Sequence, residues 1–395
     1  MGSNILIVGN GFDLYHNLPT RYTDFLTFVE YWDYFFKEYS SKTSGLLAGH
    51  TEPKKKMNIS LQNGKLSKEA VVDMAFYSVT FEKQRISYLN EHLKTNKWIQ
   101  YFNEIDYKKE GWIDFEREIE TVLRKIENYF NDILPHIEEK MKMRITGEND
   151  WEGMAAYIPP DYDVIFNLFG EGIELTDESA ACELDINNQF CRAKQKHLLL
   201  ECMKNELDIL IKCFNIYIDE FVINIDVKVQ SEQIRRLDKV SVLSFNYTNT
   251  FKTVYPDHLL GNTCFVHGNS HDGNIVMGVS DDFIDNNDYI YFQKFFQRIQ
   301  KRTGIDYENL LTSHINDGKP NEIYIMGHSL DRTDKGVLEK FVKTECKVHI
   351  FYYNQDAYEQ QVIKLVEMFG KDRIINAVAK KEIVFELLKK ACPKM

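Results

Sequence analysis

The segment Asn4-Ile-Leu-Ile-Val-Gly-Asn-Gly-Phe-Asp13 decides the fold. Its apolar run from Asn4 to Val8 is typical of a fully buried strand, and such strands are typical of parallel sheets. Gly9 and Gly11 follow the run directly, and a helix is predicted to begin next. A glycine-rich turn between a strand and a helix is how an open α/β sheet forms a ligand site at its strand ends.

Further strands are predicted in the second half of the chain, where short apolar runs alternate with helical or turn segments. These runs are Val240 to Phe245, Thr263 to Val266, Asn274 to Val279, Glu322 to Met326 and Lys347 to Tyr352. With the first strand they predict a single six-stranded sheet in an α/β fold. We therefore expect a discontinuous sheet domain, residues 1–21 and 239–395, with residues 22–238 inserted as a helical domain.

Two long helices are expected within the insertion. Apolar residues at helical spacing predict one from Trp112 to Phe130 and a second from about Ala193 to Ile223. Residues 40–68 and 147–188 are polar or irregular, and they predict loops or parts of a mobile lid.

Charge and composition exclude several classes of protein. The net charge of -12 disfavours non-specific binding to nucleic acid or to anionic membranes, because the long-range force has the wrong sign. No stretch reaches the roughly 18 apolar residues of a membrane span, so we expect a cytoplasmic protein without a membrane partner. The seven cysteines include no CxxC pair, which argues against a zinc ribbon or a disulfide framework.

The first strand-to-helix turn contains four candidate nucleotide contacts, Gly9, Asn10, Gly11 and Asp13. Glycines at this place let the backbone approach a pyrophosphate, toward which the N–H groups of the helix point. Asp13 repels phosphate, but its carboxylate accepts hydrogen bonds from ribose hydroxyls. The alternative is a tight turn in which Asp13 only caps the helix.

Three later strands also end in residues that can contact or act on a ligand. Asn246 presents an amide able to hold a water and a sugar hydroxyl together. His267 is the side chain best suited to accept a proton near neutral pH. Gly327 and Ser329 offer backbone N–H groups and a hydroxyl to phosphate or ribose. For Asn246 alone, a strand-end turn is the simpler interpretation.

An acidic cluster and a basic stripe follow the predicted strand Asn274 to Val279. The cluster is Asp281, Asp282, Asp285 and Asp288, and the stripe is Lys294, Arg298 and Arg302. Carboxylates in such a cluster can bind Mg²⁺ for phosphodiester cleavage, but a solvated acidic loop is the more common structure. Such a stripe can meet phosphates, but its spacing is more often that of the exposed surface of a helix.

Several short motifs in a fixed order point to a known family. They are Gly9-Asn-Gly-Phe-Asp13-Leu, Leu18-Pro19-Thr20, Tyr22-x-Asp24-Phe25, Ser244-Phe-Asn-Tyr-Thr248, His267-Gly268 and Gly327-His-Ser-Leu330. In this order they resemble the AbiH family of bacterial phage abortive-infection proteins. That family is similar to the sirtuin-like NAD-binding fold, so the resemblance implies a Rossmann-like, mostly parallel sheet.

The resemblance implies that Asn246 positions the attacking water or ribose and that His267 is the base. It also implies that Gly9, Gly11, Gly327 and Ser329 line the dinucleotide. In this chain Asp13 replaces the small hydroxyl residue of the sirtuin-like turn, and Thr248 replaces an aspartate. No cysteines match the zinc ribbon of sirtuin deacylases, and no metal is expected.

We therefore expect an NAD glycohydrolase that yields nicotinamide and ADP-ribose, is triggered by phage and associates with itself. Two alternatives stay open. One is a metal-dependent nuclease or nucleotidyl-processing enzyme that uses Asp281 and Asp282. The other is a non-catalytic nucleotide sensor.

Overall fold

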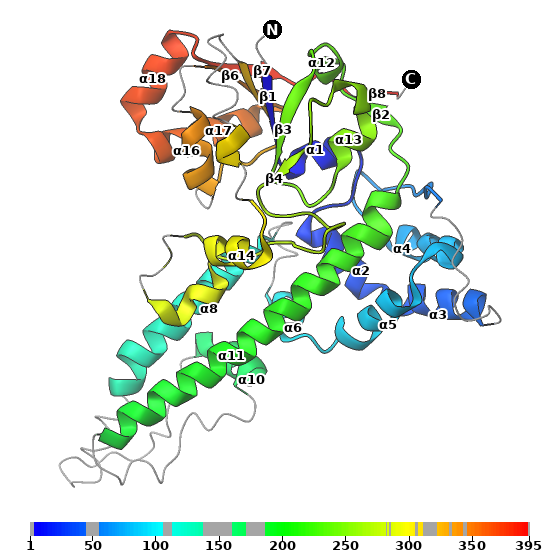
Figure 1. Ribbon diagram of the computed structural model, residues 1–395. Helices are drawn as coiled ribbons and strands as arrows, with labels where there is room; N and C mark the ends of the chain where they lie inside the picture. The colour runs from blue at the N-terminus through cyan, green and yellow to red at the C-terminus, as the bar shows by residue number, and fades with distance from the viewer. Residues whose placement is uncertain are drawn as a thin grey trace.

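A six-stranded sheet lies in the upper part of the molecule in Figure 1, and all of its strand pairs are parallel. Its strands are β1 (Asn4–Val8), β3 (Val240–Ser244), β4 (Cys264–Phe265), β5 (Glu322–Met326), β6 (Lys347–Tyr352) and β7 (Ile383–Leu387). The order across the sheet is β4-β3-β1-β5-β6-β7. The direction of strand addition therefore reverses between β1 and β5. The prediction of an α/β fold with a parallel sheet is confirmed.

The computed structural model describes residues 4–44, 55–105, 113–136, 160–170, 186–281, 283, 286–304, 307–310, 322–331, 334–342 and 346–393. The described helices are α1 (Asn10–Tyr15), α2 (Tyr22–Glu30), α3 (Trp32–Thr43), α4 (Lys68–Met74), α5 (Lys83–His92), α6 (Lys97–Glu104), α8 (Phe115–Asn128), α10 (Pro160–Phe169), α11 (Ile186–Ile216), α12 (Glu232–Arg235), α13 (Thr250–Val254), α14 (Lys294–Lys301), α16 (Lys335–Val342), α17 (Gln355–Phe369) and α18 (Lys371–Ala379). A short antiparallel pair joins β2 (Val229–Gln230) to β8 (Cys392–Pro393).

One predicted strand is wrong. Residues 274–279 do not join the sheet, although their side chains are largely buried. Their backbone groups bond outside the sheet instead: the N–H of Val276 donates to the carbonyl of His267, and the N–H of Val279 donates to that of Phe292, both at 2.8 Å. The sixth strand of the sheet is β7, which was not predicted.

Both long helices of the insertion are confirmed, and they form an arm that extends away from the sheet (Figure 1). α8 and α11 are joined by an ion pair of 2.7 Å between Glu127 and Lys196. The predicted loop at residues 147–188 is partly wrong, because α10 lies within it and α11 begins at Ile186. Outside the described residues lie 45–54 and, within that segment, 147–159 and 171–185.

The sheet is buried on both faces, which explains its apolar strands. Alternate side chains of β1 point to opposite faces. Leu6 and Val8 belong to a hydrophobic core that continues into the helical insertion. Ile5 and Ile7 belong to a second core, which includes Leu338 of α16 and residues of α17 and α18.

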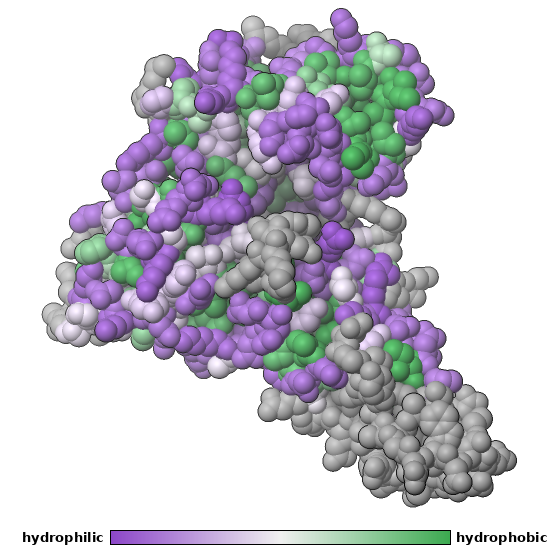
Figure 2. Space-filling model, turned by 180° about the vertical axis from the view of Figure 1, so that it is seen from behind, coloured by the Kyte–Doolittle hydropathy of each residue, from purple (hydrophilic) through white to green (hydrophobic). Residues whose placement is uncertain are grey.

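The face seen in Figure 2 is mostly hydrophilic, with a group of hydrophobic residues at its upper right, on the side of α17 and α18. Ile363, Ile375 and Val378 are exposed on these two helices. Among the helices that the structure describes, none is both long and apolar enough to span a membrane.

The turns after β1 and β5 lie in direct backbone contact. The N–H of Gly11 donates to the carbonyl of Gly327 at 2.8 Å. Gly327 has a φ of +70°, and a Cβ atom placed on it would lie 2.0 Å from the nitrogen of Phe12. A Cβ on Gly9 would lie 2.6 Å from the Cα of His328. Glycine is therefore required on both sides of this contact by packing alone.

We predict that Gly327→Ala lowers the free energy of unfolding by more than about 2 kcal/mol, because it combines a left-handed backbone with a steric overlap. Urea unfolding measures this change. The matched control is Gly336→Ala on α16, where nothing lies within 4 Å of the added Cβ. That exposed helical position should gain up to about 1 kcal/mol. Equal stability of the two variants would contradict the close contact.

Candidate functional site

The structure brings the predicted site residues to one edge of the sheet, at the carboxyl ends of four strands. Gly9, Asn10, Gly11 and Asp13 follow β1, and Gly327 and Ser329 follow β5. Asn246 follows β3, and His267 follows β4. The ring of Phe245 lies between two of these ends, 5.4 Å from the ring of His267 and 4.2 Å from that of His328.

Within this edge the side chains form two separate polar groups. The first surrounds Asp13, whose side chain is only 1% exposed. The hydroxyl of Thr248 donates to Oδ2 of Asp13 at 2.7 Å and shares a hydrogen bond of 2.8 Å with the hydroxyl of Thr250. Asn246 is buried beside this group, and its backbone N–H donates to Oγ of Ser244.

Asp13 has an incomplete set of hydrogen bonds. Its Oδ1 atom is buried without a hydrogen-bond partner. Burial raises the pKa of Asp13 to about 6, although the neighbouring polar side chains of Thr250, Thr248 and Asn246 oppose the increase. A carboxyl with this pKa can exist in either protonation state near neutral pH, which is typical of functional sites.

The second group surrounds Asp334, which lies one residue before α16. Nε2 of His267 lies 2.9 Å from Oδ1 of Asp334, and Nε2 of His328 lies 3.5 Å from Oδ2. Nδ1 of His328 accepts the N–H of Leu330 at 2.9 Å. Nδ1 of His267 is buried without a hydrogen-bond partner.

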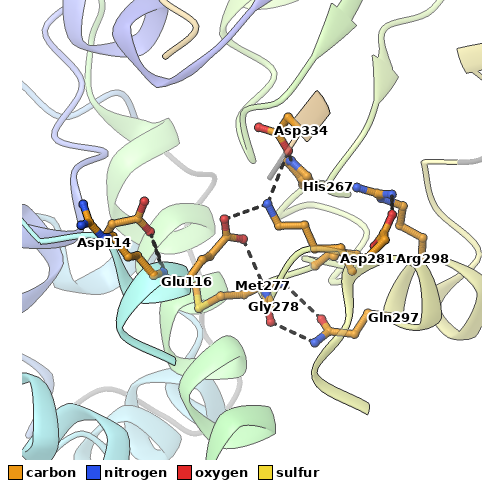
Figure 3. Close-up of polar contacts among 12 residues, drawn as sticks. Asp114, Glu116, His267, Met277, Gly278, Asp281, Gln297, Arg298 and Asp334 are labelled. Atoms are coloured by element: carbon orange, nitrogen blue, oxygen red, sulfur yellow. Dashed lines mark hydrogen bonds and ion pairs between the residues drawn. The ribbon is translucent and has the colours of Figure 1, made fainter. Parts of the chain in front are cut away.

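A buried lysine connects this second group to the helical insertion. Nζ of Lys294, at the start of α14, lies 3.4 Å from Oδ1 of Asp334 and 2.8 Å from Oε2 of Glu116 on α8. Figure 3 shows Glu116 and His267 on opposite sides of these contacts. Asp114 caps α8 by accepting the N–H of Glu116 at 3.0 Å. The ammonium therefore joins residues that are far apart in the sequence.

The charges in this group depend on one another. Burial alone would raise the pKa of Asp334, but Lys294 and then His267 outweigh burial and hold that pKa well below its ordinary value. Burial and, to a smaller extent, Lys294 lower the pKa of His267 to about 4 against the opposing effect of Asp334. Burial raises the pKa of Glu116 to about 7, because Lys294 only partly offsets it. At neutral pH, Asp334 is ionised and His267 is neutral.

The predicted exposure of the basic stripe is wrong for two of its three residues. Lys294 and Arg298 are buried, since α14 packs against the site, whereas Arg302 is exposed. Lys294 and Glu116 were missed as site residues because the pattern around each is that of an ordinary amphipathic helix. For Asp334 the sequence offered one sign of a role in the site, namely its position soon after the Gly327 turn.

The acidic cluster has structural roles where the structure describes it. Asp281 accepts the N–H of Phe295 at 2.8 Å and lies 3.4 Å from Arg298 (Figure 3). Asp288 pairs with Lys196 at 3.1 Å. Asp282 and Asp285 lie outside the described residues. In the described part of the chain, no group of three or more His, Cys, Asp or Glu side chains is arranged to hold a metal ion.

A cavity of about 340 Å³ lies beside the site. Asn249 and Thr250, which follow Asn246, line one part of it, and Asn269 and Ser270, which follow His267, line another. Residues of the insertion, including Ile223, complete the wall. Cavities of this size fall at the lower end of the range for small-molecule sites.

The raised pKa of Asp13 predicts a specific dependence of stability on pH. Between about pH 4 and pH 6 the folded protein holds a proton on Asp13 that the unfolded chain has released, so stability falls as pH rises. Relative to Asp13→Asn, the wild type should lose up to about 3 kcal/mol across this interval. Guanidinium unfolding of both proteins at several pH values measures the difference. Asp257→Asn, at an exposed position, is the control, and a difference that stays constant with pH would contradict the prediction.

A comparison with protein families supports the resemblance seen in the sequence. A family model described as "Bacteriophage abortive infection AbiH" matches residues 5–354. Neither a curated protein nor a solved structure matches the chain. The matched range covers most of the chain and includes both polar groups at the strand ends. The chain therefore belongs to the AbiH family, which assigns it to abortive infection, a defence against bacteriophage.

Proposed function

We propose that this protein hydrolyses NAD⁺ to nicotinamide and ADP-ribose when a phage-derived trigger activates it. The main support is the meeting of two glycine turns, an asparagine and a histidine where the strand order reverses. When the six strands of the sheet are numbered by their order in the chain, they lie side by side in the order 3-2-1-4-5-6. This is the order of Rossmann dinucleotide-binding folds, which bind their ligands at the reversal point.

The residues at the reversal point fit parts of a dinucleotide. Asn10 and Ser329 are exposed, and Gly11 and Gly327 are half-buried, so these turns offer polar groups to phosphate or ribose. Oδ1 of Asp13 is a buried acceptor without a partner, which suits a ribose hydroxyl. Since Asn246 and His267 are both buried, the site has to open before a substrate reaches them.

The reaction requires little acid catalysis. The bond between nicotinamide and ribose breaks with its electron pair going to nicotinamide, which leaves as a neutral molecule. Water forms the new bond to the same ribose carbon. Its proton passes to Nδ1 of His267, and the amide of Asn246 orients the water. During this exchange of bonds, the protein stabilises an oxocarbenium-like centre in a site that excludes bulk water.

The test is NAD⁺ consumption and nicotinamide release by the wild type, Asn246→Ala and His267→Ala, in phage-infected cells and with purified protein. We predict that infected cells lose NAD⁺ only with the wild type, and that each substitution lowers the rate about 100-fold or more. The matched controls are Asn376→Ala, at an exposed position on α18, and His92→Ala, at a partly exposed position on α5, and both should keep wild-type activity.

Other outcomes would select other functions. Protection against phage while NAD⁺ stays intact would refute the proposal. In that case, saturable NAD⁺ binding without turnover would indicate a nucleotide sensor. Cleavage of nucleic acid that requires Mg²⁺ and is lost in Asp281→Asn would indicate the nuclease.

A further inference from the structure

We propose that Asp334 positions His267 as the proton acceptor, and that Lys294 ties this pair to the helical insertion through Glu116. The inference rests on the proposed function for its catalytic consequence, but its structural part can be tested separately. Three buried groups and one partly buried group, on four separate segments of the chain, make the connection. They are Glu116 on α8, Lys294 on α14, Asp334 before α16 and His267 after β4.

The hydrogen bond to Asp334 determines which nitrogen of His267 holds the proton. An ionised carboxylate only accepts hydrogen bonds, so Nε2 of His267, 2.9 Å away, must donate. A neutral imidazole then has its lone pair on Nδ1, the atom left without a hydrogen-bond partner. Asp334 thus fixes the tautomer in which Nδ1 is free to accept a proton from water.

His328 supports the same arrangement. Its Nδ1 accepts the N–H of Leu330, so its Nε2 also points a hydrogen toward Asp334. The carboxylate therefore faces two imidazole N–H groups and one ammonium, and both of its oxygens are engaged. This leaves Asp334 little freedom to rotate away from His267.

Lys294 makes the position of Asp334 depend on the insertion. Its side chain is 1% exposed, and its ammonium lies between the carboxylates of Glu116 and Asp334. Oε1 of Glu116 also accepts the N–H of Gly278 at 3.5 Å. A movement of α8 would pull Glu116 away from Lys294 and leave the ammonium beside Asp334 with one carboxylate fewer to balance its charge. The helical insertion is thereby linked to the protonation of the base.

The first test replaces Asp334 by asparagine, which has the same shape but offers an N–H to Nε2 and so favours the other tautomer. In [¹⁵N]histidine NMR at pH 7, His267 of the wild type should show the Nε2–H tautomer, and Asp334→Asn should show the Nδ1–H form. The kcat for NAD⁺ hydrolysis should fall about 100-fold or more while KM changes little. Asp331→Asn, which alters a partly exposed carboxylate paired with Lys364, is the matched control that leaves both readouts unchanged.

The two readouts separate the two proposals. If the wild type does not hydrolyse NAD⁺ but the tautomer changes in Asp334→Asn, the proposed function fails and the positioning role stands. If the wild type hydrolyses NAD⁺ and Asp334→Asn retains both its tautomer and its kcat, the positioning role is overturned.

The second test concerns Lys294. The double variant Lys294→Met with Glu116→Gln replaces both members of this ion pair by uncharged side chains of similar size. No single charge of the Lys294–Glu116 pair is then left without its partner. The pKa of His267 should then rise, because Lys294 no longer disfavours the imidazolium, while Asp334 and Arg298 still face the ring. NMR titration of the labelled histidine measures the shift. An unchanged pKa in the folded double variant would overturn the role of Lys294.

Discussion

The strand-end site depends on the two ion pairs made by the buried ammonium of Lys294. The ammonium lies between two carboxylates, Glu116 and Asp334, that the insertion and the sheet respectively bring to one place. Burial of any one of these charges alone would be strongly unfavourable, whereas together they compensate one another. Since Asp334 in turn contacts His267 and His328, the charge of one lysine side chain influences the turns that follow β4 and β5.

The glycine turns give the site a rigid support of a different kind. The hydrogen bond from Gly11 to Gly327 joins the ends of β1 and β5 through the backbone alone. Their glycines thus have a packing role whether or not a ligand binds there. A rigid strand-end scaffold beside a hydrogen-bonded polar cluster is the arrangement that positions catalytic groups accurately. The cavity beside Asn249 and Asn269 gives small molecules a place next to this scaffold.

Local sequence patterns predicted most of the sheet but little of the polar network. The apolar runs of β1, β3, β5 and β6 were recognisable because they are buried on both faces. β7 was missed because most of its side chains are only partly buried at the sheet edge. Residues 274–279 were wrongly predicted as a strand because they are apolar and buried, although they do not pair in the sheet. Contacts such as that between Lys294 and Asp334 join distant segments, and no local periodicity reveals them.

The position of β1 has a consequence for how the chain is made. Asn4 pairs with Val240 and Ile5 with Ile323, so the strand at the centre of the sheet is synthesised long before either neighbour. Until β3 and β5 have been synthesised, β1 has no partner strand. Unpaired apolar strands of this kind favour aggregation. The insertion is synthesised next, and it shares a hydrophobic core with Leu6 and Val8. The helices can therefore cover one face of the first strand during translation. A chain that ends before β5 lacks Gly327, Ser329 and Asp334 and so has no complete site.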